Sequence, residues 1–145
     1  MSDLTITRIF DAPRELVYAA WTDSEQLASW LGPKGYTAHS VSGDLRPGGA
    51  WRSCIRSRKG EDLWASGEYR TIDPPSHLVF TYAWEGPDGA PQTGTLITIT
   101  FAEVGDKTQM TFVQQGLDSP ESRDGHENGW SEAFDDLGTY LAERS

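Results

Sequence analysis

The end of the chain constrains the fold most strongly, because it predicts one long amphipathic helix. Ser119 is a typical N-cap residue, Pro120 suits the first helical position, and Glu121 lies near the positive end of the helix dipole. The apolar stripe, with spacings of four, three and four residues, consists of Trp130, Phe134, Leu137 and Leu141. A helix over 120–144 would be roughly 36 Å long at about 1.5 Å per residue. That length matches the breadth of a strongly curved sheet.

The segments before this helix predict an antiparallel sheet. They alternate apolar and polar residues over short stretches, and turn residues separate them. The expected strands are a first one that ends at Asp11, then 37–41, 50–58, 63–72, 77–84, 95–101 and 108–114. Because short turns join most of these strands, we expect sequential hairpins and a sheet of about seven strands.

Two short helices are predicted between the first two strands. Pro13 fits the start of the first helix, and Asp23 or Ser24 can cap the second, which Gly32-Pro33 ends. The expected fold class is therefore α+β, with a curved antiparallel sheet wrapped around the long C-terminal helix and two short helices after the first strand. We interpret the whole chain, 1–145, as a single domain.

Such an arrangement predicts a cavity, because a sheet curved around one helix cannot fill its whole interior with side chains. Aromatic rings would bury an apolar ligand there, and hydroxyl and indole N–H groups would orient it. The candidate ligand-binding residues are Trp30, Trp51, Trp64, Tyr69, Phe80, Tyr82, Trp84, Ile97, Met110, Phe112, His126, Trp130 and Phe134. For any one ring taken singly, ordinary core packing is the alternative. The loop 85–91, with its glycines and prolines, is a candidate gate.

The register of strand 63–72 is ambiguous. Trp64 and Tyr69 have opposite parity, so we expect a bulge at Gly67 that turns both rings inward. The same bulge leaves open whether Glu68 and Arg70 point into the cavity or away from it.

Charge and cysteine content exclude several classes of protein. A formal net charge of −10 argues against nucleic acid binding, which depends on clustered cations. No apolar run has the length of a membrane span, so no membrane partner is expected. The single cysteine, Cys54, fits neither a disulfide framework nor a thiolate zinc cluster, and a cytoplasmic location is expected. Without a phosphate loop, a dinucleotide fingerprint or metal-ligand spacing, we expect no cofactor and no metal.

A series of motifs covers nearly the whole chain in a characteristic order. These are Phe10-Asp11-Ala12-Pro13, Trp21-Thr22-Asp23, Trp30-Leu31-Gly32-Pro33, Leu45-Arg46-Pro47-Gly48-Gly49, Ile72-Asp73-Pro74-Pro75 with Leu78-Val79-Phe80-Thr81, and Gly125-His126-Glu127-Asn128-Gly129-Trp130. Together they resemble the heat-shock-protein-90 ATPase activator-like branch of the START and birch-pollen-allergen (SRPBCC) superfamily. One departure is Leu31, where many relatives carry a second tryptophan. The resemblance implies a helix-grip fold that binds lipids, polyketides or other apolar small molecules.

Three functions follow from these observations. The first is a non-enzymatic intracellular protein that binds an apolar or amphipathic small molecule in the cavity. The second is a cyclase or hydrolase acting on a polyketide-like substrate, with His126, Glu68 and Tyr82 as its polar groups. The third is a chaperone or regulatory partner-binding module. The eukaryotic activators resemble this chain only in their second domain, so a chaperone partner is not expected. A homodimer through exposed sheet edges or the acidic helix stays open.

Overall fold

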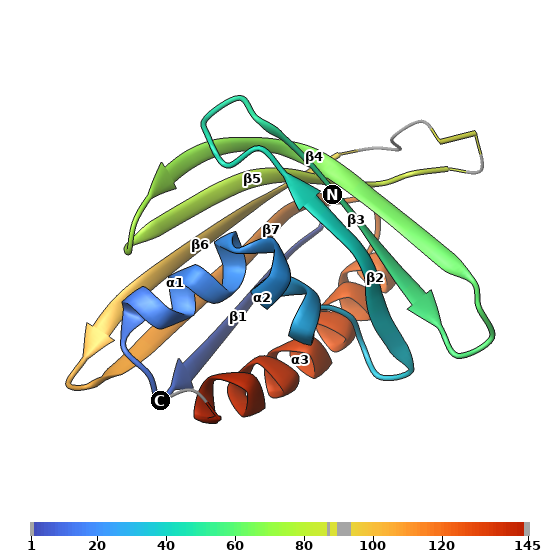
Figure 1. Cartoon of the computed structure of the whole chain (residues 1–145). Helices are drawn as coiled ribbons and strands as arrows, with labels where there is room; N and C mark the ends of the chain where they lie inside the picture. Colours follow the sequence, from blue (N-terminus) through green and yellow to red (C-terminus); the bar gives the residue numbers. More distant parts are fainter. Residues whose placement is uncertain (1, 87, 90–93, 144–145) are drawn as a thin grey trace.

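The computed structural model describes residues 2–86, 88–89 and 94–143 and confirms the α+β fold (Figure 1). The elements are β1 (Ser2–Phe10), α1 (Arg14–Thr22), α2 (Ser24–Trp30), β2 (Tyr36–Gly43), β3 (Ala50–Ser57), β4 (Asp62–Asp73), β5 (His77–Trp84), β6 (Thr95–Val104), β7 (Lys107–Leu117) and α3 (Pro120–Ala142). The strands form one seven-stranded sheet in the order β1-β7-β6-β5-β4-β3-β2, and every neighbouring pair is antiparallel. Part of the loop proposed as a gate, residues 87, 90 and 91, lies outside the described residues.

The sheet curves over α3, while α1 and α2 cover its interior beside that helix (Figure 1). The expected helix caps are confirmed. The hydroxyl of Ser119 accepts a hydrogen bond from the backbone N–H of Ser122 at 3.0 Å, and the carboxylate of Asp23 accepts one from the N–H of Glu25 at 3.0 Å. None of the described helices is long and apolar enough to cross a membrane.

The core is dense around Trp21 of α1. The ring centroids of Trp30, Phe112 and Phe134 lie 4.8, 6.2 and 5.9 Å from that of Trp21. Phe112 of β7 and Phe134 of α3 are fully buried. The indole N–H of Trp30 donates to the carbonyl oxygen of Ala20 at 3.1 Å, which ties α2 to α1. This cluster joins both short helices, the long helix and the sheet into one solid region.

The expected inward turn of both rings in β4 is wrong. No residue is inserted at Gly67, and the register shift lies between Tyr69 and Thr71. Because five positions separate them without a bulge, Trp64 and Tyr69 face opposite sides of the sheet. Tyr69 is buried in the interior, whereas Trp64 lies on the outer face, with the Arg52 guanidinium 3.8 Å from its ring centroid.

Position 67 requires glycine because of a close contact with β5 and not because of the expected bulge. A Cβ at this position would overlap the carbonyl oxygen of Thr81. That oxygen accepts a hydrogen bond from the indole N–H of Trp51 at 3.0 Å, and Thr81 Oγ1 accepts another from the N–H of Glu68 at 2.8 Å. The missing side chain therefore lets the ring of Trp51 reach across to β5.

Glu68 and Arg70, whose direction the sequence leaves open, both lie on the outer face of the sheet. Glu68 and Arg70 are exposed, and their side chains are 3.6 Å apart. Glu68 borders a shallow polar hollow on the outer face of the sheet, together with Arg52 and Glu85. The cavity inside the sheet therefore receives neither charge.

Candidate functional site

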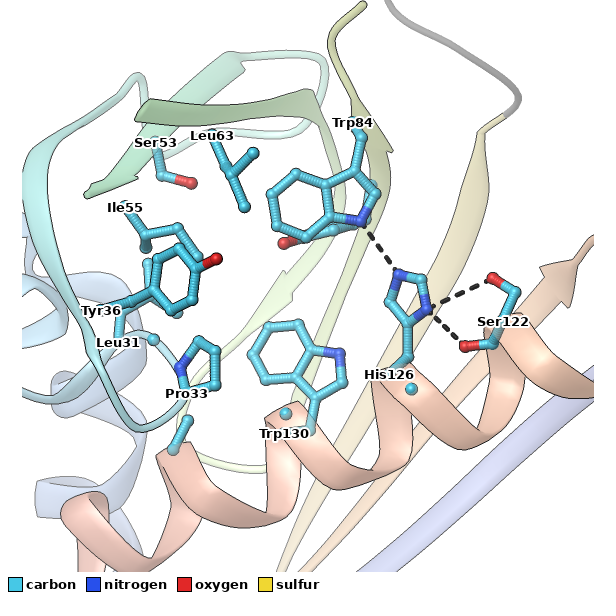
Figure 2. A pocket seen from close by; sticks show the side chains of 15 residues that line it. Leu31, Pro33, Tyr36, Ser53, Ile55, Leu63, Trp84, Ser122, His126 and Trp130 are labelled. Atoms are coloured by element: carbon cyan, nitrogen blue, oxygen red, sulfur yellow. Dashed lines mark hydrogen bonds between the residues drawn. The ribbon is translucent and has the colours of Figure 1, made fainter. Parts of the chain in front are cut away.

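A cavity of about 350 Å³ lies between the N-terminal half of α3 and strands β2 to β5 (Figure 2). This volume lies within the usual range of ligand pockets, roughly 300–1,000 Å³. The residues that line it are Leu31, Gly32, Pro33, Tyr36, Ser53, Ile55, Leu63, Tyr82, Trp84, Ser122, Gly125, His126, Gly129, Trp130 and Ala133. No lysine, arginine, aspartate or glutamate is among them, as far as the described residues go. The wall is therefore aromatic and aliphatic, with a few hydroxyl groups.

A smaller cavity of about 40 Å³ adjoins the larger one. The two share Leu31, Ser53, Tyr82 and Trp130 as lining residues. These shared side chains mark the inner end of the larger cavity, where it meets the solid core.

Small residues on α3 form one wall of the larger cavity. Gly125, Gly129 and Ala133 repeat every four residues, so they lie on one face of the helix. A Cβ at Gly125 would meet nothing within 4 Å, and one at Gly129 would meet only Pro33 Cβ at 3.8 Å. Neither glycine has a positive φ. Backbone conformation and packing therefore do not require glycine here, and the missing side chains provide room.

His126 makes hydrogen bonds through both of its ring nitrogens. The indole N–H of Trp84 donates to Nε2 of His126 at 3.0 Å, and Nδ1 of His126 lies 2.7 Å from the carbonyl oxygen of Ser122 (Figure 2). An indole N–H only donates and a carbonyl oxygen only accepts, so Nδ1 carries the proton and Nε2 does not. Both ring nitrogens are therefore occupied, and the imidazole joins β5 to α3.

A buried amide orients the other tryptophan of the cavity. The indole N–H of Trp130 donates to Oε1 of Gln114 at 3.0 Å, and Nε2 of Gln114 donates to Thr95 Oγ1 at 2.9 Å. Thr95 Oγ1 in turn donates to the carbonyl oxygen of Tyr82 at 2.8 Å. Gln114 is fully buried. This chain of hydrogen bonds fixes the plane of Trp130, which forms part of both cavities.

Three hydroxyl groups remain for a ligand. The side chains of Tyr36, Ser53 and Tyr82 line the cavity, and their hydroxyls make no hydrogen bond to another described residue. Burial raises the pKa of Tyr82 well above its ordinary value, so its hydroxyl stays protonated and can donate. Figure 2 shows the hydroxyls of Tyr36 and Ser53 on the cavity side of their strands.

The structure divides the candidate ligand-binding residues into four groups. The larger cavity is lined by Tyr82, Trp84, His126 and Trp130. The smaller cavity adds Trp51, Tyr69 and Phe80. The residues buried in the core without lining either cavity are Trp30, Ile97, Met110, Phe112 and Phe134. Trp64 alone of the set lies on the outer face, because its parity along β4 is opposite to that of Leu63.

Several residues of the site lie outside the set predicted from the sequence. Gln114 resembled an ordinary polar strand residue, although its parity with the apolar Met110 and Phe112 was a usable signal. Gly125 and Gly129 were noticed as part of a motif but not as a wall. The connection 31–33 and Tyr36 come to the cavity through the packing of α2 against β2, which no local pattern indicates.

The polar groups proposed for an enzyme are not brought together. His126 and Tyr82 both line the cavity, but Glu68 lies on the outer face of the sheet. Among the described residues, no group of three or more histidine, cysteine, aspartate or glutamate side chains is placed to hold a metal ion.

Solved structures share this fold over nearly the whole chain. The AHSA1 protein from Silicibacter pomeroyi is 25% identical with a TM-score of 0.91, and the match covers 99% of this chain and 100% of that one. A protein from Arthrobacter aurescens is 27% identical with a TM-score of 0.88, covering 97% and 86% of the two chains. A protein from Mycobacterium smegmatis is 28% identical with a TM-score of 0.82, covering 96% and 90%.

In sequence, none of the curated proteins matches the chain significantly. The model of one protein family does, and it spans residues 11–142, from the end of β1 to the end of α3. That stretch includes every residue that lines the two cavities. The chain therefore belongs to the family of Activator of Hsp90 ATPase homolog 1-like proteins.

Proposed function

We propose that this protein binds an apolar or amphipathic small molecule in the cavity between α3 and strands β2 to β5. The observation that carries the proposal is the glycine wall of α3. A glycine inside a helix costs about 1 kcal/mol relative to alanine. At Gly125 and Gly129 neither the backbone nor a close neighbour offsets that cost. An occupant that lies against the bare helix backbone does offset it.

The chemistry of the walls supports the same proposal. The side chains of Leu31, Ile55 and Leu63 face the rings of Trp84 and Trp130 across the cavity (Figure 2). Burying apolar ligand surface against such walls contributes about 25 cal/mol per Å². The indole N–H groups of Trp84 and Trp130 are bonded to His126 and Gln114, which leaves the ring surfaces free for contact.

Binding is favoured over catalysis by the state of the polar groups. A general base needs a free nitrogen or oxygen within reach of the substrate. Both nitrogens of His126 are already bonded, and Tyr82 keeps its proton. We further infer a cytoplasmic location for this function, because the only cysteine, Cys54, is free and buried.

Native mass spectrometry of freshly purified protein tests the proposal directly, because a retained small molecule adds a reproducible mass. A titration with the neutral fluorescent probe N-phenyl-1-naphthylamine gives the affinity of the cavity. In Gly125→Leu the new side chain would enter the cavity, since its Cβ meets no neighbour. We expect this variant to lose probe affinity at least about tenfold while its helix gains stability.

Gly138→Ala is the matched control on the same helix. A Cβ at Gly138 would touch the ring of Phe10 at 3.8 Å, away from both cavities. This variant should bind the probe as the wild type does. Unchanged probe binding by Gly125→Leu would contradict the proposal, as would a wild type that binds neither the probe nor a co-purified molecule.

A further inference from the structure

We infer that the ligand of this cavity is uncharged and carries an oxygen atom that hydrogen-bonds with the hydroxyls of Tyr82 and Ser53. The inference rests on the proposed function and narrows the chemical class of the ligand. Phenols, alcohols and ketones belong to this class, whereas carboxylates, phosphates and quaternary ammonium ions do not.

The lining of the cavity offers no partner for a charged ligand. It contains no lysine, arginine, aspartate or glutamate among the described residues, and both ring nitrogens of His126 are already hydrogen-bonded. Moving an ion from water into an apolar site costs several kcal/mol unless an opposite charge or several hydrogen bonds compensate it. A carboxylate would also need the guanidinium or ammonium group that usually pairs with it in proteins.

The charge of the whole molecule also disfavours the binding of anions. A net charge of −10 repels anionic molecules at long range. A cation would be attracted, but within the cavity it would meet aromatic faces and uncharged hydroxyl groups, and no carboxylate among the described residues. The attraction of the aromatic faces reaches about 2 kcal/mol, less than the cost of removing an ion from water. A neutral molecule avoids both penalties.

Two buried hydroxyls specify where the oxygen of the ligand lies. Tyr82 is 9% exposed and Ser53 is 5% exposed, and their hydroxyls make no hydrogen bond to another described residue. The indole N–H groups of Trp84 and Trp130 are unavailable, because His126 and Gln114 accept them. A hydroxyl that faces the cavity without a partner gains a hydrogen bond from a ligand oxygen.

The positions of these hydroxyls also orient the ligand. Tyr82 and Ser53 line both cavities and therefore lie at the inner end of the larger one. Leu63, another lining residue, is 42% exposed and lies at the side that reaches solvent. The polar group of the ligand is thus innermost, and its apolar body extends along Gly125 and Gly129.

Calorimetric titration with four naphthalene derivatives tests this inference at pH 7. They share one bicyclic body and carry a hydroxyl, a methyl, a carboxylate or a trimethylammonium group at the same ring position. We expect the uncharged hydroxyl compound, 2-naphthol, to bind roughly fivefold tighter than 2-methylnaphthalene, because only the former makes the hydrogen bond. The carboxylate and the ammonium compounds should bind at least about a hundredfold more weakly than 2-naphthol.

Tyr82→Phe isolates the hydrogen bond, because it removes the oxygen and keeps the ring. This variant should prefer 2-naphthol over 2-methylnaphthalene less strongly than the wild type does, because only the Ser53 hydroxyl remains to bond with the ligand oxygen, and its affinity for 2-methylnaphthalene should match that of the wild type. Tyr18→Phe is the control, since the Tyr18 hydroxyl donates to the carbonyl oxygen of His77 at 3.0 Å and lines neither cavity. It should leave the preference for 2-naphthol unchanged.

The outcomes separate this inference from the proposed function. A charged compound that binds within tenfold of 2-naphthol overturns the inference while supporting a ligand-binding cavity. Equal binding of the hydroxyl and methyl compounds by the wild type likewise overturns it. If none of the four compounds binds, the proposed function fails and the inference fails with it.

Discussion

The two halves of α3 face different interiors. The C-terminal half places Phe134 and Leu137, both fully buried, into the aromatic core around Trp21. The N-terminal half presents Gly125 and Gly129 to the cavity. One regular helix thus fills one part of the interior and leaves another part open.

The difference between the halves lies in side-chain volume and not in the backbone. α3 runs without interruption from Pro120 to Ala142. Trp130 stands at the boundary, since its ring lies 4.9 Å from that of Phe112 on one side and lines the cavity on the other. We therefore expect α3 to contribute most to stability where its inward residues are large, whereas the proposed binding site lies where glycines form part of its inward face.

Truncating one leucine in each region should show the largest difference. Leu137 is fully buried in the solid core, whereas Leu63 lines the cavity and is 42% exposed. Leu137→Ala should lower the free energy of unfolding by about 2–5 kcal/mol, because it leaves a void in close-packed surroundings. Leu63→Ala should lower it by less than about 1 kcal/mol. Urea denaturation followed by circular dichroism measures both, and equal losses would mean that the two regions are packed alike.

Removing the side-chain amide of Gln114, which orients Trp130, should have a smaller effect on stability than Leu137→Ala. It should also weaken ligand binding clearly. Gln114→Leu leaves the indole N–H of Trp130 and the hydroxyl of Thr95 without this partner. We expect a loss of about 1–3 kcal/mol in unfolding free energy. The ring of Trp130 is then free to turn, so probe affinity should fall as well.

Gln115→Leu is the control for this change, because Gln115 is exposed on the same strand. It should alter stability by no more than about 0.5 kcal/mol. If Gln114→Leu binds the probe as tightly as the wild type, the hydrogen-bond chain does not position Trp130.

Alkaline pH should destabilise the protein through buried tyrosines in both regions. Burial raises the pKa of Tyr82 at the cavity, and it raises the pKa of Tyr18 in the solid region to about 12. An unfolded tyrosine ionises near pH 10 (its pKa is about 10), so above that pH the unfolded chain releases protons that the folded chain keeps. The stability present below about pH 10 is therefore lost as the pH rises toward the folded pKa values.

Tyr82→Phe sharpens this test. It should reduce the slope of stability against pH above pH 10 by at most about 1.4 kcal/mol per pH unit. Urea midpoints measured between about pH 9 and 11 give the slope. A slope identical to that of the wild type would show that Tyr82 ionises as readily in the folded protein as in the unfolded chain.

Adding a methyl group to α3 should give the smallest change in stability, and that change should be positive. Gly129→Ala and Gly138→Ala should each raise the unfolding free energy by about 0.4–1 kcal/mol, because each limits the unfolded backbone and meets its neighbours at 3.8 Å. Only Gly129→Ala should weaken probe binding, since Gly129 alone of the two lines the cavity. Thermal melts paired with probe titrations distinguish the two effects. Equal binding by both variants would remove the functional contrast between the halves of the helix.

Local patterns were sufficient to predict the elements of this fold. The caps at Ser119 and Asp23 lie where the sequence places them, because side-chain capping depends on residues only two or three positions away. The alternation Phe80, Tyr82, Trp84 correctly indicates the inward face of β5, since parity along a regular strand is a local property.

The candidate site was harder to predict, because cavity and core have the same apolar signature. Phe112 and Trp84 are equally aromatic, yet the first is enclosed by core rings and the second lines the cavity. The error at Trp64 arose because Gly67 was taken for a bulge. Glycine is required at position 67 because Trp51 and Thr81 approach it closely from two other strands. No pattern within β4 indicates this approach.

The order of the elements, their caps and the faces of the regular strands can be predicted locally, because they depend on neighbours along the chain. Which apolar faces meet, and where they fail to meet, depends on how the elements pack in three dimensions. The cavity exists because glycines of α3 oppose strands β2 to β5, while Phe134 and the leucines of the same helix oppose the rest of the sheet. A void is set by the volumes of side chains that are distant in sequence, so it appears only when the chain is folded.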